Sequence, residues 1–113
     1  MDLCRAMPAA TEEQPFGPEV AVFKVGGKIF ALISLDDEPA HVSLKCEPGL
    51  AELLREQYAA VGPGYHLNKR HWNTVRLDGS VPEGELRDWL EESYALVRAG
   101  LPRRRSRGAA AER

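Results

Sequence analysis

Short runs of β-branched and aromatic residues dominate the first half of the chain. One run covers Val20–Val25 and a second covers Lys28–Leu35, and only Gly26-Gly27 separates them. Both glycines can take the positive φ angles of a tight turn, so the pattern predicts a β-hairpin. A third run, His41–Cys46, alternates polar and apolar residues, as a strand with one buried face does. Three neighbouring strands of this kind predict an antiparallel meander.

Helical spacing replaces this alternation in two places. Pro48 suits the first turn of a helix, which is expected to stop before Gly62-Pro63-Gly64. The apolar residues on one face of this helix are Leu50, Leu53, Leu54 and Tyr58. A second helix is expected after Ser80-Val81-Pro82-Glu83, which matches a capping box, and it ends at Gly100-Leu101-Pro102. Its apolar stripe consists of Leu86, Trp89, Leu90, Tyr94, Val97 and Leu101.

Two further strands are predicted between these helices. The first lies around Tyr65–Asn68, and a turn follows at Lys69-Arg70-His71. The second covers Trp72–Leu77, where alternate residues point to opposite sides of the sheet. One side carries Asn73, Val75 and Leu77, and the other carries Trp72, Thr74 and Arg76.

The two ends of the chain lack regular patterns. Residues 1–14 are expected to form an N-terminal arm or a short helix, and Phe16, between turn formers, is expected to anchor the core. Residues 15–101 then form a single domain, followed by a disordered Arg-rich tail at 102–113. The predicted fold class is α+β, an antiparallel sheet of about five strands with helices packed on one face. The other face is left to solvent or to a partner.

Composition narrows the class of protein. The chain has 113 residues, of which 43% are hydrophobic and 28% are charged, as in one soluble globular domain. Its longest apolar run, Ile29–Leu35, is far shorter than the roughly 18 residues of a membrane helix. The N-terminus lacks the apolar segment of a signal peptide. We therefore expect a cytoplasmic protein without a membrane partner.

Charge is unevenly distributed along the chain. The formal net charge of −2 argues mildly against a protein that coats nucleic acid by bulk attraction. Residues 1–63 contain five Lys/Arg against ten Asp/Glu, whereas residues 64–113 contain ten against seven. The second part includes the Arg-rich run Arg103–Arg107, which can add salt-sensitive phosphate affinity if DNA is the partner. The sequence is therefore compatible with a local basic face on an acidic protein.

Metal binding and catalysis are not favoured. Cys4, near a terminus expected to fray, and Cys46 are expected to be free thiols. The spacing of His66, His71 and Cys46 fits no standard metal site. Tyr65 or His66 as a general base lacks an oriented partner. We expect no metal, no cofactor and no enzymatic activity.

The segment Gly64–Val75 has the densest polar and aromatic chemistry of the chain. It contains two imidazoles, two fixed cations, two aromatic rings and two side-chain amides within twelve residues. Lys69 and Arg70 can contact phosphates, while Trp72 or His71 can stack on a base. The alternative is a tight turn whose tryptophan packs against the sheet edge and whose cations are solvated.

Further cations are expected on the polar side of the strands. Lys45 and Arg76 share that side in the prediction, and an open sheet face would then be basic. The alternative is ordinary cross-strand charge balance, which contributes only about 0.2–1 kcal/mol per pair. Lys24 and Lys28 flank the Gly26-Gly27 turn. The hairpin tip could form a wing that contacts a DNA backbone, or it could be an ordinary hairpin with a lysine at each end of its turn. The turn is not a phosphate loop, because no helix follows its glycines.

Several of these segments together resemble the MmcQ/YjbR family. The matching stretches are Pro15-Phe16-Gly17, Phe23–Ala31, Val42–Cys46 and Gly64–Val75. The resemblance runs from about Pro15 to Val97, and its last stretch is the most specific. It implies a fold similar to that of bacterial frataxin-like proteins, with an antiparallel sheet flanked by helices. The family is described as DNA-binding, a description based on fold comparison, and the resemblance brings no catalytic residue.

These observations predict a small non-enzymatic domain that binds DNA. The expected nucleic-acid contacts are Lys45, Lys69, Arg70, His71, Trp72 and Arg76. The alternative is a module that binds a protein or a small ligand, without nucleic acid. Its expected pocket is walled by Tyr65, His66, Asn68 and Trp72. The net charge and the acidic first half favour this alternative, and the protein is expected to be a monomer or a weak dimer.

Overall fold

The computed structural model describes residues 2–36, 38–64 and 67–101. Within these ranges the elements are α1 (Asp2–Arg5), β1 (Thr11–Glu13), β2 (Val20–Val25), β3 (Lys28–Ser34), β4 (His41–Lys45), α2 (Pro48–Gln57), β5 (Val61–Pro63), β6 (Trp72–Arg76) and α3 (Glu83–Ala99). None of these helices has the length and hydrophobicity needed to cross a bilayer. Tyr65 and His66 of the predicted pocket, and the predicted tail at 102–113, lie outside the described residues.

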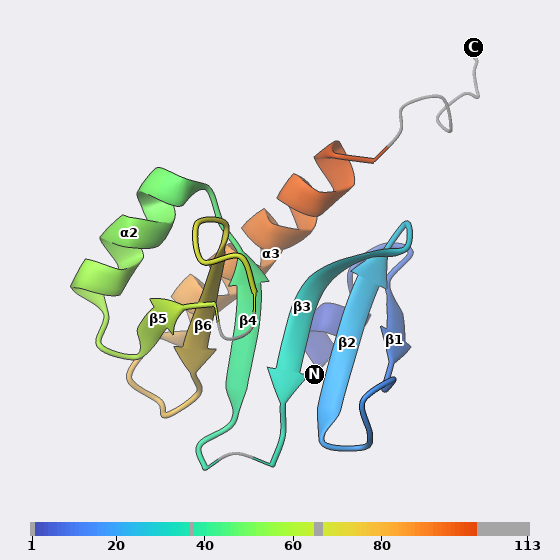
Figure 1. Ribbon diagram of the computed structural model, residues 1–113, viewed down its shortest axis with the longest axis horizontal. Coiled ribbons are helices and arrows are strands. Elements are labelled where there is room, and N and C mark those ends of the chain that lie inside the picture. The colour runs from blue at the N-terminus through green and yellow to red at the C-terminus, as the bar shows by residue number, and fades with distance from the viewer. Residues whose placement is uncertain (1, 37, 65–66, 102–113) are drawn as a thin grey trace.

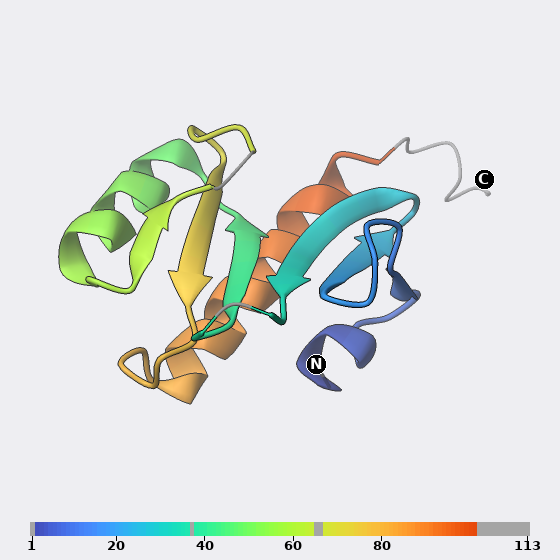
Figure 2. The same cartoon turned by 60° about the horizontal axis from the view of Figure 1, so that its bottom comes forward.

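The strands form one antiparallel sheet in the order β1-β2-β3-β4-β6-β5 (Figure 1). All three helices contribute to a single buried core on one face of this sheet, through Cys4 of α1, Leu54 of α2 and Leu90 of α3. Figure 2 shows α1 and α3 on the same side of the sheet. The predicted α+β class, with an antiparallel sheet covered on one face, is confirmed. The sheet has six strands in the described ranges, where about five were predicted.

The predicted hairpin of β2 and β3 is confirmed almost to the residue. Its turn uses Gly26 and Gly27 at φ angles of 59° and 81°, a backbone conformation that residues with a Cβ rarely adopt. A Cβ built on Gly26 would lie only 2.5 Å from Cδ1 of Leu101. The hairpin tip therefore rests against the residue that follows the end of α3.

A β-bulge interrupts β3 at Phe30. Phe23 pairs with Ala31, and Lys24 pairs with Ile29, so Phe30 has no partner on β2. Such a bulge bends the strand and increases its twist. It also turns two successive side chains, Phe30 and Ala31, into the core, where both are fully buried.

Ser93 of α3 joins β3 to β4 beyond the end of their pairing, which stops at Ala31 and Leu44. The Ser93 hydroxyl accepts a hydrogen bond from the Lys45 N–H at 2.8 Å and donates one to the Phe30 carbonyl at 2.6 Å. Figure 1 shows β3 curving away from β4 toward the hairpin tip, with α3 passing behind the two strands. The sheet therefore opens at this end, and α3 bridges the opening.

The N-terminal residues are more ordered than the sequence pattern indicates. Thr11–Glu13 pairs antiparallel with β2 as the edge strand β1, which was not predicted. Cys4 does not lie in a frayed end, because it is only 1% exposed and packs in the core. Burial raises the pKa of the Cys4 thiol to about 11, and burial also raises the pKa of Cys46. The expectation that Phe16 anchors the core is wrong, since its side chain is 68% exposed.

Two local features in the second half differ from the sequence prediction. Leu67 and Asn68 of the strand predicted at Tyr65–Asn68 are not in a strand, and Tyr65 and His66 lie outside the described residues. β6 pairs instead with β5 at Val61–Pro63, where proline is tolerated because an edge strand leaves one side unpaired. The predicted capping box does not form, because the N-cap of α3 is Pro82 and makes no side-chain cap. Ser80 instead donates its hydroxyl to Asp78 Oδ1 at 2.6 Å, within the preceding turn.

Candidate nucleic-acid interface

The sheet face opposite the helices carries a regular array of polar side chains. On β4 and β6, the cross-strand pairs on this open face are His41 with Arg76, Ser43 with Thr74, and Lys45 with Trp72. The alternate residues Val42, Leu44 and Val75 are buried in the core, so the predicted sidedness of both strands is confirmed. Because Arg76 lies four residues beyond Trp72, Lys45 and Arg76 are separated by about 13 Å along the strands. The two cations share a face but lie at opposite ends of it.

A groove of about 470 Å³ lies at the Lys45 end of the open face. The hairpin provides one wall, the ends of β4 and β6 provide the other, and the end of α3 closes the base. Its lining residues are Lys24, Gly27, Lys28, Ile29, Lys45, Trp72, Val97 and Gly100. This lysine groove lies where β3 and β4 separate, so the bulge and the Ser93 bridge create the space for it.

Positive charge in the lysine groove is only partly compensated. Lys24 Nζ lies 3.1 Å from Glu13 Oε1 of β1. Among the residues that the structure describes, neither Lys28 nor Lys45 has a carboxylate within salt-bridge distance. Two lysines without such a partner, from opposite walls, therefore line the groove together with Trp72.

Arg55 of α2 fixes the loop that leads from β5 to β6. Its Nε donates to Asn73 Oδ1 at 2.7 Å, and its Nη2 donates to the carbonyls of Lys69 and Trp72. The Asn73 amide in turn donates to the Ala51 carbonyl at 3.3 Å. In the sequence, Arg55 looks like any solvent-facing cation of an amphipathic helix, so no pattern there indicates this role.

The predicted site residues Asn68, Lys69 and Arg70 lie in a turn beside the lysine groove wall. All three are exposed, and the predicted turn at residues 69–71 is confirmed. Asn68 Oδ1 accepts a hydrogen bond from the Arg70 N–H at 2.9 Å. Lys69 Nζ donates to the Gly64 carbonyl at 3.1 Å. The Lys69 ammonium therefore helps to close its own loop, while the Arg70 side chain extends from the turn into solvent.

Backbone contacts hold Trp72 at the junction of this turn and the groove. The Gly64 N–H donates to the Trp72 carbonyl at 2.9 Å, and the Cys46 N–H donates to the His71 carbonyl at 2.7 Å. A Cβ built on Gly64 would lie 2.7 Å from the Trp72 Cβ, so only glycine fits here without a shift. His71 itself is half-buried. The pocket predicted for the alternative function stays a prediction, because Tyr65 and His66 lie outside the described residues.

The far end of the open face carries Arg76. Its Nη2 lies 3.4 Å from Asp78 Oδ2. Hydrogen bonds from Ser80 lower the pKa of Asp78, and the nearby Arg76 lowers it further, so this carboxylate is ionised and shares the charge of Arg76. Among residues 2–36, 38–64 and 67–101, no three His, Cys, Asp or Glu side chains are grouped as metal ligands.

These features define a small α+β domain whose antiparallel sheet has one helix-covered face and one open polar face. The chain belongs to the YjbR family, whose model matches residues 5–96. It is 43% identical over 90 residues to the protein YbdF of Escherichia coli O157:H7, covering 80% of this chain and 74% of the relative. It is 40% identical over 103 residues to the uncharacterized protein YjbR of Escherichia coli strain K12, covering 90% and 86%.

Solved structures agree with this assignment. The crystal structure of protein DR2400 from Deinococcus radiodurans, described as a DUF419 domain, superposes with a TM-score of 0.86 at 39% identity. That match covers 96% of this chain and 85% of the other. A crystal structure of a Pseudomonas syringae protein superposes with a TM-score of 0.74 at 27% identity, covering 85% and 93%. The resemblance to the MmcQ/YjbR family seen in the sequence is therefore confirmed for the fold.

Proposed function

We propose that this protein binds DNA, and that the lysine groove holds the sugar–phosphate backbone of one strand. Lys28 and Lys45 contact phosphates from the two walls, and Trp72 offers a flat surface for a base or a sugar. The observation that supports the proposal is the position of these two lysines, which line one groove with Trp72 and have no carboxylate within salt-bridge distance among the described residues.

The net charge of −2 does not oppose this proposal. At physiological ionic strength the Debye length is about 8 Å, so charges beyond that distance are largely screened from the groove. Glu83 and Glu85, in the first turn of α3, lie about 18 Å or more along the helix from Val97 and therefore count less at the groove than the lysines that line it. Two carboxylates are closer: Glu13 forms an ion pair with Lys24, and Glu92 lines a small pocket together with Lys45.

The other predicted contact residues contribute unequally to DNA binding in this proposal. Arg70 lies in the exposed turn next to Trp72 and extends the positive surface beyond the groove. Lys69 contributes less, because its ammonium is hydrogen-bonded to the Gly64 carbonyl. Arg76 contributes least, because it lies about 13 Å away along the sheet and shares its charge with Asp78.

Fluorescence anisotropy with short labelled single-stranded and duplex DNA, at a series of salt concentrations, tests the proposal. Each phosphate contact contributes about −0.9 to the slope of log affinity against log salt for duplex DNA and about −0.7 for single strands. We expect Lys28→Ala and Lys45→Ala each to reduce the slope by about one contact. The matched control is Arg87→Ala, an exposed cation of α3, which should leave affinity and slope unchanged.

The proposal fails if wild-type protein binds neither form of DNA at low salt. It also fails if the Lys28→Ala/Lys45→Ala double variant keeps the wild-type affinity and salt slope. If the double variant and Arg87→Ala lose the same DNA affinity, the attraction depends on the overall charge of the protein and not on the groove.

A further inference from the structure

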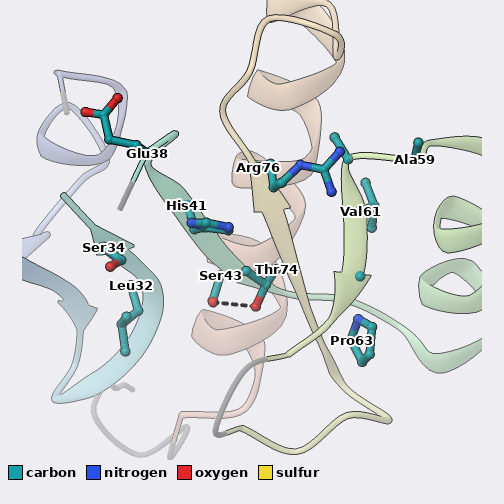
Figure 3. A pocket seen from close by; sticks show the side chains of 12 residues that line it. Leu32, Ser34, Glu38, His41, Ser43, Ala59, Val61, Pro63, Thr74 and Arg76 are labelled. Carbon is teal, nitrogen blue, oxygen red and sulfur yellow. Dashed lines mark hydrogen bonds between the residues drawn. The ribbon is translucent and has the colours of Figure 1, made fainter. Parts of the chain in front are cut away.

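A second concavity, of about 570 Å³, lies on the open face between β3 and β5 (Figure 3). We call it the open-face pocket. Its lining residues are Leu32, Ser34, Glu38, His41, Ser43, Ala59, Ala60, Val61, Gly62, Pro63, Thr74 and Arg76. None of them lines the lysine groove, so the two hollows are separate sites on the same face.

Polar side chains line the middle and one end of this pocket. The Ser43 and Thr74 hydroxyls lie side by side across β4 and β6, with their oxygens 2.8 Å apart. One pair further along, His41 lies opposite Arg76. In Figure 3 the imidazole and the guanidinium both extend over the same side of the sheet. Hydroxyls can donate and accept hydrogen bonds, whereas a guanidinium only donates and is always positive.

Apolar side chains form the two walls. Leu32 of β3 lies on one side and Pro63 of β5 lies on the other, as Figure 3 shows, whereas the Val61 side chain pairs with Val75 and is buried in the core. Ala59 and Ala60 extend the second wall toward α2. Pockets of about 300–1,000 Å³ with apolar walls and a few placed polar groups are typical of small-molecule sites. The volume and the lining of the open-face pocket both match that description.

We infer that the open-face pocket binds a small organic anion that has one carboxylate or phosphate and an apolar part of about one ring. The anionic group pairs with Arg76 through short, charge-assisted hydrogen bonds. It also accepts from the one hydroxyl of the Ser43–Thr74 pair whose proton is not used in their mutual hydrogen bond. The apolar part lies between Leu32 and Pro63. This inference does not depend on DNA binding.

Two carboxylates limit the charge of the ligand. Asp78 already lies 3.4 Å from Arg76, so the guanidinium can accommodate one further anionic group but not several. Glu38 lines the rim, and its carboxylate points away from the hydroxyl pair in Figure 3. A ligand with two or more anionic groups would meet one of these carboxylates. The pocket therefore favours a singly charged end.

Gly62 offers a clean way to block the pocket. It pairs with Thr74, so a side chain at this position would project from the open face. A Cβ built on Gly62 meets no atom within 4 Å, and its φ angle is not in the left-handed region. The Gly62→Val variant should therefore fold normally and place two methyl groups in the pocket, and a β-branched residue suits a strand better than glycine.

Titration of ¹⁵N-labelled protein with benzoate, phenyl phosphate and neutral benzamide, followed by two-dimensional NMR, tests the inference. At millimolar concentrations we expect benzoate or phenyl phosphate to shift the amide signals of Ser43, Thr74 and Arg76. Benzamide should bind about tenfold more weakly, because it lacks the charge that Arg76 recognises. Inorganic phosphate alone should also bind weakly, because it lacks the apolar part.

Three variants separate this inference from the proposed function. Gly62→Val should abolish the shifts but keep DNA binding, and Arg76→Gln should remove the preference for benzoate over benzamide. Lys28→Ala should weaken DNA binding and leave benzoate binding unchanged. The inference is overturned if neither aromatic anion shifts the pocket signals, if benzamide binds as well as benzoate, or if the shifts persist in Gly62→Val.

Discussion

Replacing Ser93 by alanine should destabilise the protein strongly, although alanine is the better helix former. The Ser93 side chain is fully buried in α3, and its hydroxyl is the only atom changed. In the wild type this hydroxyl accepts from the Lys45 N–H at 2.8 Å and donates to the Phe30 carbonyl at 2.6 Å. Alanine leaves both backbone groups without this partner, at a point where β3 and β4 no longer pair with each other.

The expected size of the effect follows from these two contacts. A buried polar group that loses its partner costs about 1–3 kcal/mol. Two such groups cost about 2–6 kcal/mol, and the higher helix propensity of alanine offsets about 0.5 kcal/mol. We expect a net loss of about 1.5–5.5 kcal/mol in the free energy of unfolding. In a domain of this size the loss corresponds to a decrease in Tm of at least about 6 °C.

Urea denaturation followed by circular dichroism measures this loss. The matched control is Ala95→Ser, which makes the reverse substitution at an exposed position of the same helix and should cost about 0.5 kcal/mol. Hydrogen exchange adds a local readout, because the Lys45 amide should lose its protection first. A Ser93→Ala variant within about 0.5 kcal/mol of the wild type would refute the reasoning, because the hydroxyl would then contribute no more than an exposed one.

Three other predictions follow from single contacts. Arg55→Lys should keep the charge but lose most of the contacts that hold the loop, because lysine cannot reproduce the guanidinium fork. Faster hydrogen exchange of the Trp72 amide would show this loss, and exchange at the wild-type rate would contradict it. Gly64→Ala should cost about 1–3 kcal/mol through the contact with Trp72, whereas Gly62→Ala meets open space and should be neutral or stabilising in thermal denaturation; equal effects would contradict the close approach. The pKa of Cys4 rises from 9.0 to about 11 on folding, so its contribution to stability is complete below pH 9 and is lost as the pH rises toward 11. Urea denaturation should therefore show the wild type losing up to about 1.4 kcal/mol per pH unit relative to Cys4→Ala, and a constant difference would contradict this.

The elements that sequence patterns predict best are those with a strong period and a burial difference between two faces. The β2–β3 hairpin, β4 and β6 follow from alternation, and both long helices follow from their apolar stripes. The edge strands β1 and β5 were missed, because each has only three residues and neither shows an apolar alternation. Such strands form because a neighbouring strand offers unpaired backbone groups, and the residues of the edge strand itself do not indicate this.

Individual side chains were harder to predict than elements. Ser93 falls in an apolar helix stripe and Arg55 falls at a polar helix position, so neither has a local signal. Their partners lie far along the chain, with Phe30 63 residues from Ser93 and Lys69 14 residues from Arg55. Phe16 shows the opposite case, because a large aromatic residue between turn formers looks like a core anchor and is exposed. The burial and hydrogen bonding of these side chains therefore depend on residues far along the chain.

The lysine groove itself depends on contacts of this long-range kind. Lys28 and Lys45 belong to neighbouring strands, but they do not face each other in a ladder, because β3 and β4 stop pairing at Ala31 and Leu44. The Phe30 bulge bends β3 away, and Ser93 satisfies the backbone groups that this separation leaves. The width of the groove is therefore set from the helix side of the sheet. It follows that Ser93→Ala, at temperatures where it remains folded, should change the DNA affinity even though Ser93 does not line the groove.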